Sequence, residues 1–343
     1  MTSTVVLFRG SGEPLLMQSR PVPRPDRGHV LIRVLASGIC DTDARFVRLG
    51  IPGMRGPVVL GHQIAGVVES VGEGVEALRQ GDRVVIHFVI GCGQCPFCAR
   101  GEDNLCPNWR AIGVHADGGF AQYVLVPAEN ALPIPEALSP EEASLIPCGL
   151  GTPYRAIKQA RVQAGEVVLI QRAWVWGLAA ISLCHLFGAR VIVLDDDDDR
   201  LRFAREHGAE VAVDVRSEDV KSVLARRAPG GADVLIDFTG DPEHISRGLS
   251  FVRRGGRAVI VGRAGCVGEV KLDLPALIFT EISVAGAWLT RHGEVCELVD
   301  WVAKGHFRLS ALVTHRLRLD VEEIARGIDL VSQPSTLGVV ILP

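Results

Sequence analysis

The segment GCGQCPFCARGEDNLC, residues 91–106, constrains the fold of this chain more than any other stretch of its sequence. Cys92, Cys95, Cys98 and Cys106 follow the pattern C-x2-C-x2-C-x7-C. Four thiolates on a tight loop suit a tetrahedral Zn²⁺ with no open coordination position, which is a structural site. Iron–sulfur clusters use other spacings, and four unrelated buried thiols are the alternative to metal binding. The pattern predicts a zinc-bound lobe without a chemical role.

Cysteine usage and charge also limit where the protein works and what it binds. Nine cysteines in a chain of 343 residues, four of them clustered, fit metal binding in a reducing compartment, so we expect a cytoplasmic protein. No secretory signal is visible in MTSTVVLFRGSGEPLL. A net charge of −4 with scattered Lys and Arg predicts neither nucleic-acid nor membrane binding. The apolar window 173–189 is short and contains polar residues, which favours a buried helix over a membrane span.

The pattern of apolar runs changes along the chain, and the length of 343 residues suggests about two domains. Up to about residue 130, short Val/Ile runs between Gly and Pro predict an irregular β-rich domain. After Pro140 strands alternate with helices: strands at 166–170 and 190–195, helices at 177–189 and 200–209, and further strands in VAVD, ADVLIDFTG and GRAVIVG. Such alternation predicts an α/β domain with a doubly wound parallel sheet. The last fifty residues are expected to return to the first domain.

The cysteine lobe, the segment GHQIAGVVESVGEGV and the strand–helix series together resemble a zinc-dependent alcohol dehydrogenase of the medium-chain dehydrogenase/reductase family. The resemblance runs over almost the whole chain. It implies a GroES-like β-rich zinc catalytic domain at 1–148 and 288–343. It also implies a Rossmann-type domain of the nucleotide-binding kind at 149–287. Relatives are commonly homodimers or homotetramers, so a homo-oligomer is expected here, and ISVAGAWL (282–289) is either an interface strand or an internal one.

The resemblance implies a second, catalytic zinc. Cys40 in GICDTD, His62 in GHQ and Cys148 in PCGLGTPYRAI match the family's three ligands, and this set leaves a fourth position for water or a substrate oxygen. Asp43 matches the residue that hydrogen-bonds the ligating imidazole. Thr42 matches the hydroxyl that passes on the proton of the alcohol, with a helix cap as the alternative. About two zinc ions per chain are therefore expected, one structural and one catalytic.

Three residues near this site depart from the family pattern. Gln63 stands where the family commonly has Glu, so a carboxylate close to the metal is missing. Arg45 stands where several relatives have a proton-relaying His, and guanidinium is a poor proton shuttle but a good anchor for carboxylate or phosphate. Asp41 places an anion where some relatives have a cation that faces the cofactor pyrophosphate. The alternative for each of them is an exposed residue without a role.

The phosphate-binding turn departs further. The family motif G-x-G-x-x-G, aligned on Gly177, gives Arg172 for the first glycine and Trp174 for the second, and Trp176 adds another bulky group. The second glycine normally lets the pyrophosphate approach the backbone, whereas an indole occupies that space and brings no charge. Arg172 is ambiguous, since a cation can help to hold phosphate. The alternative is that the indoles point into a neighbouring core.

Other cofactor contacts are mixed. Asp195 matches the acid that binds the adenosine ribose, which favours NAD over NADP because Asp196 and Asp197 repel a 2′-phosphate. The run 195–199 is otherwise read as a helix cap with a solvated acidic loop. Gly338 stands about where relatives carry a Lys or Arg for the pyrophosphate. Each lost charged hydrogen bond costs about 1.5–3 kcal/mol, so ordinary NAD(H) binding is expected to be lost.

Three functions on a small-molecule substrate are compatible with these residues. The first is a zinc enzyme that no longer transfers hydride and uses the metal as a Lewis acid in a lyase, isomerase, cyclisation or hydration step on an alcohol or carbonyl compound. The second is a NAD(H)-dependent zinc alcohol dehydrogenase with a remodelled cofactor loop. The third is a non-catalytic homologue. The chemistry of the turn favours the first, the family favours the second, and the metal ligands argue against the third. The first, a non-redox zinc enzyme, is therefore expected, with the NAD(H)-dependent dehydrogenase as the alternative.

Overall fold

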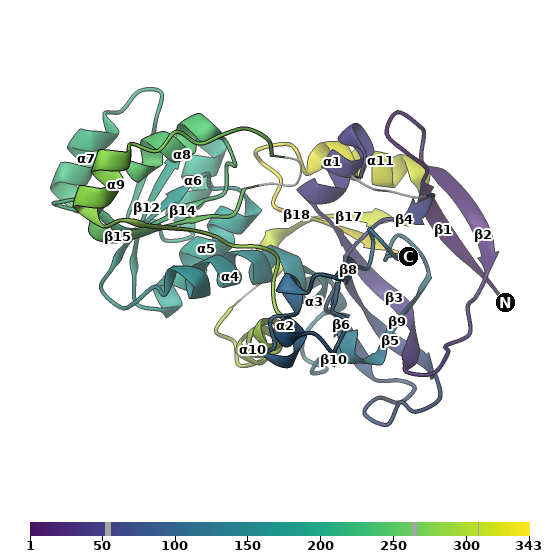
Figure 1. The fold of residues 1–343 in the computed structure, drawn as a ribbon. Helices are drawn as coiled ribbons and strands as arrows, with labels where there is room; N and C mark the ends of the chain where they lie inside the picture. Colours follow the sequence, from purple (N-terminus) through teal and green to yellow (C-terminus); the bar gives the residue numbers. More distant parts are fainter. Residues whose placement is uncertain (52–55, 263–265, 308) are drawn as a thin grey trace. The chain divides into compact units, whose positions relative to one another are not determined.

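The computed structural model describes residues 1–51, 56–262, 266–307 and 309–343, and the chain forms two compact units (Figure 1). The first unit comprises Met1–Gly151 and Leu289–Pro343, and the second comprises Thr152–Trp288. The first is rich in β-strands and the second alternates strands and helices. This is the α/β fold class expected from the sequence, with a GroES-like unit and a Rossmann-like unit. Among the described residues, none of the helices combines the length and apolar character that crossing a bilayer requires.

In its described residues, the first unit contains three sheets, each antiparallel or mixed. Its strands are β1 (Thr2–Phe8), β2 (Leu16–Pro21), β3 (His29–Ile39), β4 (Val58–Val59), β5 (Gln63–Val71), β6 (Arg83–Ile86), β7 (Val89–Ile90), β8 (Arg110–Ala111), β9 (Tyr123–Pro127), β10 (Ala131–Pro133), β17 (Val313–Arg318) and β18 (Gly338–Leu342). Its helices and helical turns are α1 (Asp41–Leu49), α2 (Pro96–Ala99), η1 (Asp103–Leu105), η2 (Ala128–Asn130), α3 (Pro140–Leu145), η3 (Ile146–Leu150), α10 (His292–Ala303), η4 (Ser310–Leu312) and α11 (Val321–Leu330).

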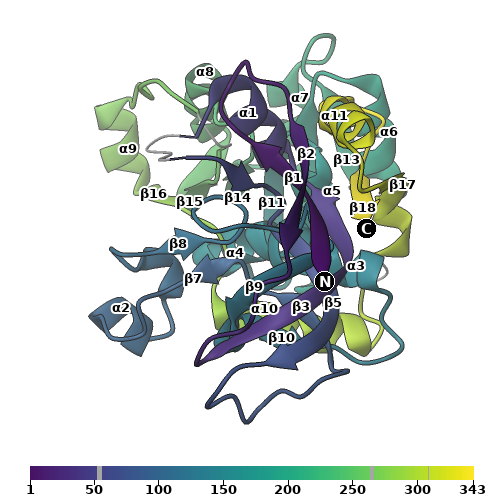
Figure 2. The same ribbon diagram turned by 90° about the vertical axis from the view of Figure 1, so that its right-hand side faces the viewer.

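The two chain segments of this unit are joined through one sheet. In the described part of the chain it runs in the order β10-β6-β5-β3-β18-β17, and β9 also pairs with β3. The C-terminal strand β18 lies antiparallel to β3, as the yellow and purple ribbons show (Figure 2). Since β3 ends at Ile39 and β5 begins at Gln63, the register of these two strands brings Cys40 and His62 to the same end of the sheet.

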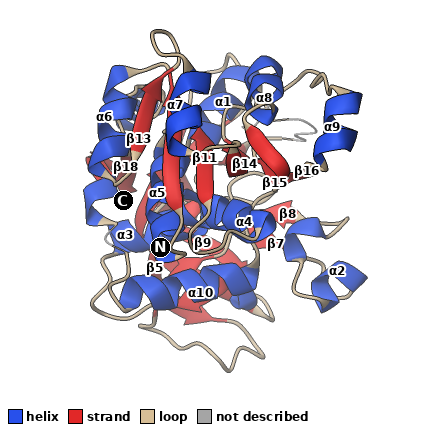
Figure 3. Ribbon diagram, turned by 90° about the vertical axis from the view of Figure 1, so that its left-hand side faces the viewer, coloured by secondary structure: helices blue, strands red, loops and turns tan. Residues whose placement is uncertain are grey.

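The second unit carries a parallel sheet flanked by helices (Figure 3). Its elements are α4 (Gly151–Ala160), β11 (Val167–Gln171), α5 (Val175–Leu186), β12 (Arg190–Asp195), α6 (Asp198–Glu206), β13 (Val211–Asp214), α7 (Val220–Arg227), β14 (Ala232–Asp237), α8 (Pro242–Leu249), β15 (Val252–Ile260), α9 (Leu274–Thr280) and β16 (Ser283–Gly286). The strand order β13-β12-β11-β14-β15-β16 is the 3-2-1-4-5-6 order of dinucleotide-binding sheets. The order reverses between β11 and β14, where such folds bind their ligands.

Local sequence explains where the helices of this unit begin and end. Helix α6 starts at Asp198, two residues before the expected start, because the Asp197 carboxylate accepts the Arg200 N–H as an N-cap. Helix α5 ends at Leu186, three residues before the expected end. Gly188 there adopts φ +73°, a left-handed conformation that closes the helix and that glycine tolerates best.

Candidate zinc and cofactor sites

Three metal-binding side chains meet in the first unit. Cys40 follows β3 and caps α1, His62 precedes β5, and Cys148 lies in the π-helical turn η3. Their donor atoms lie within 4.8 Å of one another, and all three residues are buried. The sulfur atoms of Cys40 and Cys148 are 3.9 Å apart. Two thiols and an imidazole at this spacing suit tetrahedral zinc with one position open.

Neighbouring side chains hold the His62 ring. The Asp43 carboxylate is fully buried: one oxygen accepts the Cys40 backbone N–H at 2.8 Å, and the other lies 3.5 Å from His62 Nδ1. Phe88 packs edge-on against the same ring, with centroids 5.0 Å apart. Because Asp43 lies next to Nδ1, Nε2 is the nitrogen that is left for a metal. No sequence pattern had pointed to Phe88.

The charge balance of the site fits a bound cation. Burial disfavours the charged form of His62, but the Asp43 carboxylate outweighs it and raises the pKa of the imidazole to about 10. Contact with the Cys148 thiol, together with burial, raises the pKa of Cys40. Two close thiols beside a buried carboxylate thus favour a positive charge at this point. A bound zinc ion would supply that charge and would stabilise the thiolate forms of the two cysteines.

The other residues expected at this site differ in their exposure to solvent. Thr42 and Arg45 are partly exposed on α1, and the N-cap of that helix is Cys40, so Thr42 is not its cap. Gln63 is 4% exposed, and its Oε1 is buried without a hydrogen-bond partner in the described structure. A Cβ on Gly38 would lie 2.9 Å from this oxygen, so the amide occupies a space that only glycine leaves open.

The four clustered cysteines also converge, with donor atoms within 4.8 Å of one another. Cys95 caps the short helix α2 and its sulfur accepts the Cys98 N–H, while the Cys106 sulfur accepts the Cys92 N–H. Backbone N–H groups aimed at sulfur stabilise thiolates. The donor set of four thiols therefore fits a closed zinc site.

A His–Asp pair, in which His87 is buried and Asp103 is partly exposed, connects this cysteine lobe with the wall of the three-ligand site. Asp103, in η1 between Cys98 and Cys106, lies 2.6 Å from His87 Nε2, and His87 directly precedes Phe88. The other Asp103 oxygen accepts the His292 backbone N–H of α10. His87 and Phe88 lie between strands β6 and β7, so the pair is placed where one strand ends and the next begins.

The unusual turn after β11 keeps the backbone of a glycine motif. Arg172 adopts φ +77°, the left-handed conformation that glycine normally supplies. At Gly177 an added Cβ would overlap the Arg172 carbonyl oxygen, so helix α5 can pack this close only on glycine. Arg172 thus supplies the left-handed conformation at the first glycine position, whereas Trp174 at the second has φ −75° and ψ −174°, an extended backbone that any residue adopts.

The indole side chains are packed within the second unit. Trp176 lies against Phe238, with ring centroids 6.3 Å apart. Trp174 is the N-cap residue of α5, and the Arg172 guanidinium lies over its ring at 4.9 Å from the centroid. Trp176 thus packs into a neighbouring core, which was the alternative expected for the indoles. Trp174 instead lies at the start of α5 and stacks with Arg172.

The Asp195 carboxylate already has several hydrogen-bond partners within the second unit. Its carboxylate accepts the backbone N–H groups of Ala173, Asp196 and Asp197, and it forms an ion pair with Arg200 at 2.7 Å. Burial raises the pKa of Asp195, but the hydrogen bonds and charge of Arg200 lower it below the usual value. Arg200 was not among the expected site residues, although its position directly after the acidic run 195–199 could have suggested it.

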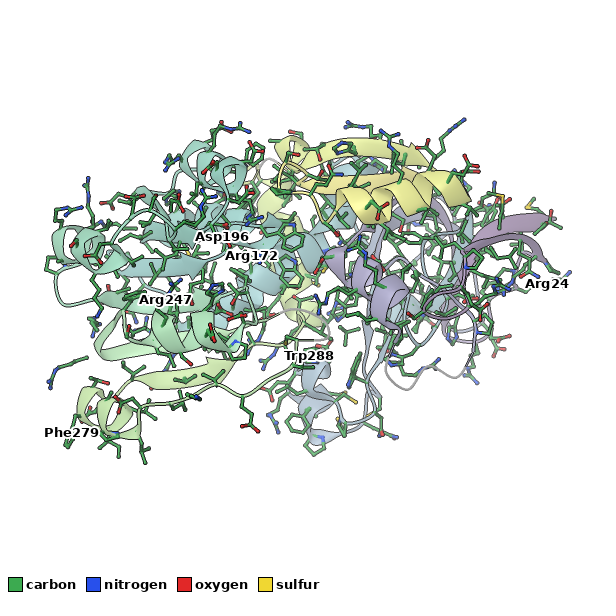
Figure 4. All side chains as sticks on the ribbon, turned by 90° about the horizontal axis from the view of Figure 1, so that it is seen from above. Arg24, Arg172, Asp196, Arg247, Phe279 and Trp288 are labelled. Carbon is green, nitrogen blue, oxygen red and sulfur yellow. The ribbon has the colours of Figure 1, made fainter. Side chains whose placement is uncertain are left out.

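A small pocket lies at the carboxyl ends of β11, β12 and β14. Its lining residues are Gln171, Arg172, Asp195, Asp196, Val215, Thr239, His244 and Arg247. Figure 4 shows Arg172 and Asp196 close to each other at this edge, with Arg247 on α8. The C-terminal Gly338 begins β18, and a Cβ there would overlap the Leu312 carbonyl oxygen, so a long cation does not fit at that position.

Comparisons with known proteins agree with this architecture. The alcohol dehydrogenase GroES-like domain matches residues 26–136, and the zinc-binding dehydrogenase family matches residues 176–304. A NAD-dependent alcohol dehydrogenase of Sulfurisphaera tokodaii is 31% identical, over 95% of this chain and 96% of its own. An alcohol dehydrogenase from Escherichia coli CFT073, solved with NADH, is 29% identical with a TM-score of 0.92 over 100% and 99% of the chains. A Sinorhizobium meliloti 1021 protein assigned as a zinc-binding dehydrogenase, solved with NADP, is 31% identical with a TM-score of 0.91 over 100% of both.

These relatives overturn the expectation of a non-redox zinc enzyme. They are dehydrogenases, one named for its dependence on NAD and one solved with NADH, which points to oxidoreduction and not to a lyase, isomerase, cyclisation or hydration step. The prediction was wrong because it took the bulky residues at two glycine positions, above all Trp174, to block dinucleotide binding. Arg172 adopts the left-handed conformation, and Gly177 preserves the close approach of α5 to the turn.

The expectation that NAD(H) binding is lost has no support either, since nicotinamide cofactors are bound to solved relatives. Its weakness was physical: it counted Trp176 as an obstruction, whereas this ring packs on Phe238. The expectation of zinc, by contrast, agrees with the match to the zinc-binding dehydrogenase family, and Cys and His residues suited to zinc lie close together here.

Proposed function

We propose that this chain, which belongs to the zinc-dependent alcohol dehydrogenase-like proteins of the medium-chain dehydrogenase/reductase family, oxidises an alcohol or reduces a carbonyl compound with NAD(H). The observation that carries the proposal is the buried set of Cys40, His62 and Cys148, a three-ligand metal site of the catalytic kind. Zinc, when bound there, supplies a Lewis acid for the substrate oxygen, and NAD(H) supplies the hydride acceptor or donor.

The chain's own residues then have distinct tasks. Asp43 orients His62 through Nδ1 and holds the backbone of Cys40, so that two ligands are positioned by one carboxylate. The Thr42 hydroxyl, on the first turn of α1, would relay the proton of the substrate alcohol: it would accept that proton while giving its own hydroxyl proton onward to water. Gln63 keeps the neighbouring position neutral, so no carboxylate competes with substrate for the metal.

The cofactor is assigned to the second unit. The strand order, the retained turn and the pocket at the carboxyl ends of β11, β12 and β14 support a dinucleotide at this edge. Asp195 and Asp196 favour NAD over NADP, because a 2′-phosphate would meet two carboxylates.

Titration with NADH, followed by its fluorescence, tests the cofactor first. Binding in the sub-millimolar range is expected, and reduction of NAD⁺ in the presence of a panel of primary, secondary and polyhydric alcohols tests the reaction. Absence of NADH binding by zinc-loaded protein would contradict the proposal. NADPH at equal concentration is the comparison, and tighter binding of NADPH would contradict the preference for NAD.

We further propose a homodimer or homotetramer. Strand β16 is an edge of the parallel sheet, with Val284 41% exposed, and α9 has no buried residue. Phe279 is 74% exposed and stands at the outer side of this helix (Figure 4). Exposed apolar surface beside an unpaired strand edge is typical of an interface. Light scattering coupled to gel filtration gives the mass, and a monomer at micromolar concentration would contradict this proposal.

A further inference from the structure

Arg172 holds a backbone conformation that its side chain makes costly. Its φ of +77° lies in the left-handed region, where a Cβ crowds the backbone and glycine is normally found. Glycine at this position would relieve the strain without changing the path of the turn. A strained non-glycine residue at a ligand-binding edge is a sign that its side chain is used.

The position of the guanidinium supports such a use. It is stacked over the Trp174 ring at 4.9 Å from the centroid, and it lines the pocket at the carboxyl ends of the strands. The indole therefore acts as a flat support that limits the rotation of a long side chain. Arg247 lines the same pocket and brings a second cation to it (Figure 4).

The acidic residues of this edge are balanced by a different arginine. Arg200 contacts Asp195 through Nε and Nη2 and reaches Asp196 through Nη2 at 2.8 Å. The Asp195 carboxylate also accepts three backbone N–H groups. One guanidinium thus offsets one of the two negative charges of Asp195 and Asp196 inside the second unit, so these residues oppose an anionic ligand less than their sequence suggests.

We propose that Arg172, supported by Trp174, binds the pyrophosphate of the dinucleotide through its guanidinium, in place of the bare glycine backbone. The stack of Arg172 on Trp174 then contributes to binding of the pyrophosphate and does not block it. A planar guanidinium matches two phosphate oxygens at once, which a glycine turn does with N–H groups. The assignment rests on the proposed dinucleotide function of this unit.

Binding of ADP and of adenosine to the full zinc-loaded protein, measured by calorimetry, separates the phosphate contact from the rest of the site. We expect Arg172→Gly to weaken ADP binding about 10- to 100-fold, as the loss of a charged hydrogen bond implies. The affinity of Arg172→Gly for adenosine stays that of the wild type. Arg172→Lys weakens ADP binding by a factor between those of the wild type and Arg172→Gly, because an ammonium group lacks the planar pair of N–H donors of a guanidinium. Trp174→Ala also weakens ADP binding, by a smaller factor.

Two controls keep the result interpretable. Arg161→Gly relieves the same kind of strain, at φ +52° in the same unit but away from the turn, and leaves ADP affinity unchanged. Since glycine suits the conformation of residue 172, Arg172→Gly keeps or raises the melting temperature, and a folding defect does not confuse the measurement.

Unchanged or tighter ADP binding by Arg172→Gly overturns the inference, and so does an equal loss for ADP and adenosine. Failure of the wild type to bind millimolar ADP overturns it as well. The proposed function is judged separately: Arg172-dependent binding of ADP without alcohol-dependent reduction of NAD⁺ supports the phosphate contact and contradicts the dehydrogenase.

Discussion

Gly177 lies directly against the carbonyl oxygen of Arg172, so close that a Cβ on the glycine would overlap that oxygen. This contact fixes the distance between the first turn of α5 and the end of β11. It explains why this glycine is kept while the other two positions of the motif carry large side chains. The packing of helix on strand needs a missing Cβ here, whereas the turn itself needs only the left-handed conformation that Arg172 supplies at a cost.

Gly177→Ala is therefore expected to destabilise the second unit by about 1–3 kcal/mol, because the added methyl group must displace backbone. Urea unfolding followed by circular dichroism measures the loss. Gly293→Ala is the matched control: it lies in α10 with nothing within 4 Å of the added Cβ, so it should be neutral or slightly stabilising. Equal stability of the two variants would contradict the close packing at Gly177.

Metal analysis should find about two zinc ions per chain. Cys98→Ser removes a ligand of the closed site and should lose one zinc together with several degrees of melting temperature, because a structural metal contributes to folding. Cys148→Ala should lose the other zinc and the dehydrogenase activity with a smaller effect on melting. A wild-type content of one zinc, unchanged in Cys148→Ala, would disprove the catalytic site.

Asp43→Asn is expected to weaken zinc at the three-ligand site about 10- to 100-fold, since it removes the negative charge beside His62 Nδ1. Competition with a fluorescent chelator gives the affinity. Asp320→Ala removes the N-cap of α11 in the same unit and should cost about 1 kcal/mol of stability without changing zinc affinity. If both variants weaken zinc equally, Asp43 acts through stability alone.

The ion pair between Asp195 and Arg200 predicts a pH-dependent stability. The pKa of Asp195 is lowered in the folded state, so the pair stabilises the fold above the unfolded value of about 3.9, and this contribution fades as the pH falls through the folded value. Arg200→Gln leaves the buried carboxylate without its cation and should cost about 3–5 kcal/mol at pH near 7.

Urea unfolding at several pH values checks the ion pair. The difference between wild type and Arg200→Gln should shrink below pH of about 4, where protonation of Asp195 removes the unpaired charge. A difference that is independent of pH would show that Arg200 stabilises the unit by packing and not by charge.

Much of the architecture was predictable because its signals are local. The alternation of strands and helices after Pro140 indicated the parallel sheet, and the spacing from Cys92 to Cys106 indicated a closed metal site. Cys40, His62 and Cys148, far apart in sequence, were identified through the resemblance to a family, since no local spacing connects them.

The donor chemistry can be identified from the residues alone: which thiols, imidazoles and carboxylates the chain offers, and where along the chain its strands lie. How the unusual turn works follows instead from contacts between distant segments. Trp176 could block a ligand, but it packs on Phe238. Asp195 could be free to bind a ribose, but it forms an ion pair with Arg200. In both cases the outcome depends on a partner from another part of the chain. The type of a residue specifies the size and charge of its side chain. Its backbone dihedral angles and the side chains that surround it depend on how distant segments pack. For this reason Arg172, which reads as a lost glycine, keeps the conformation of one.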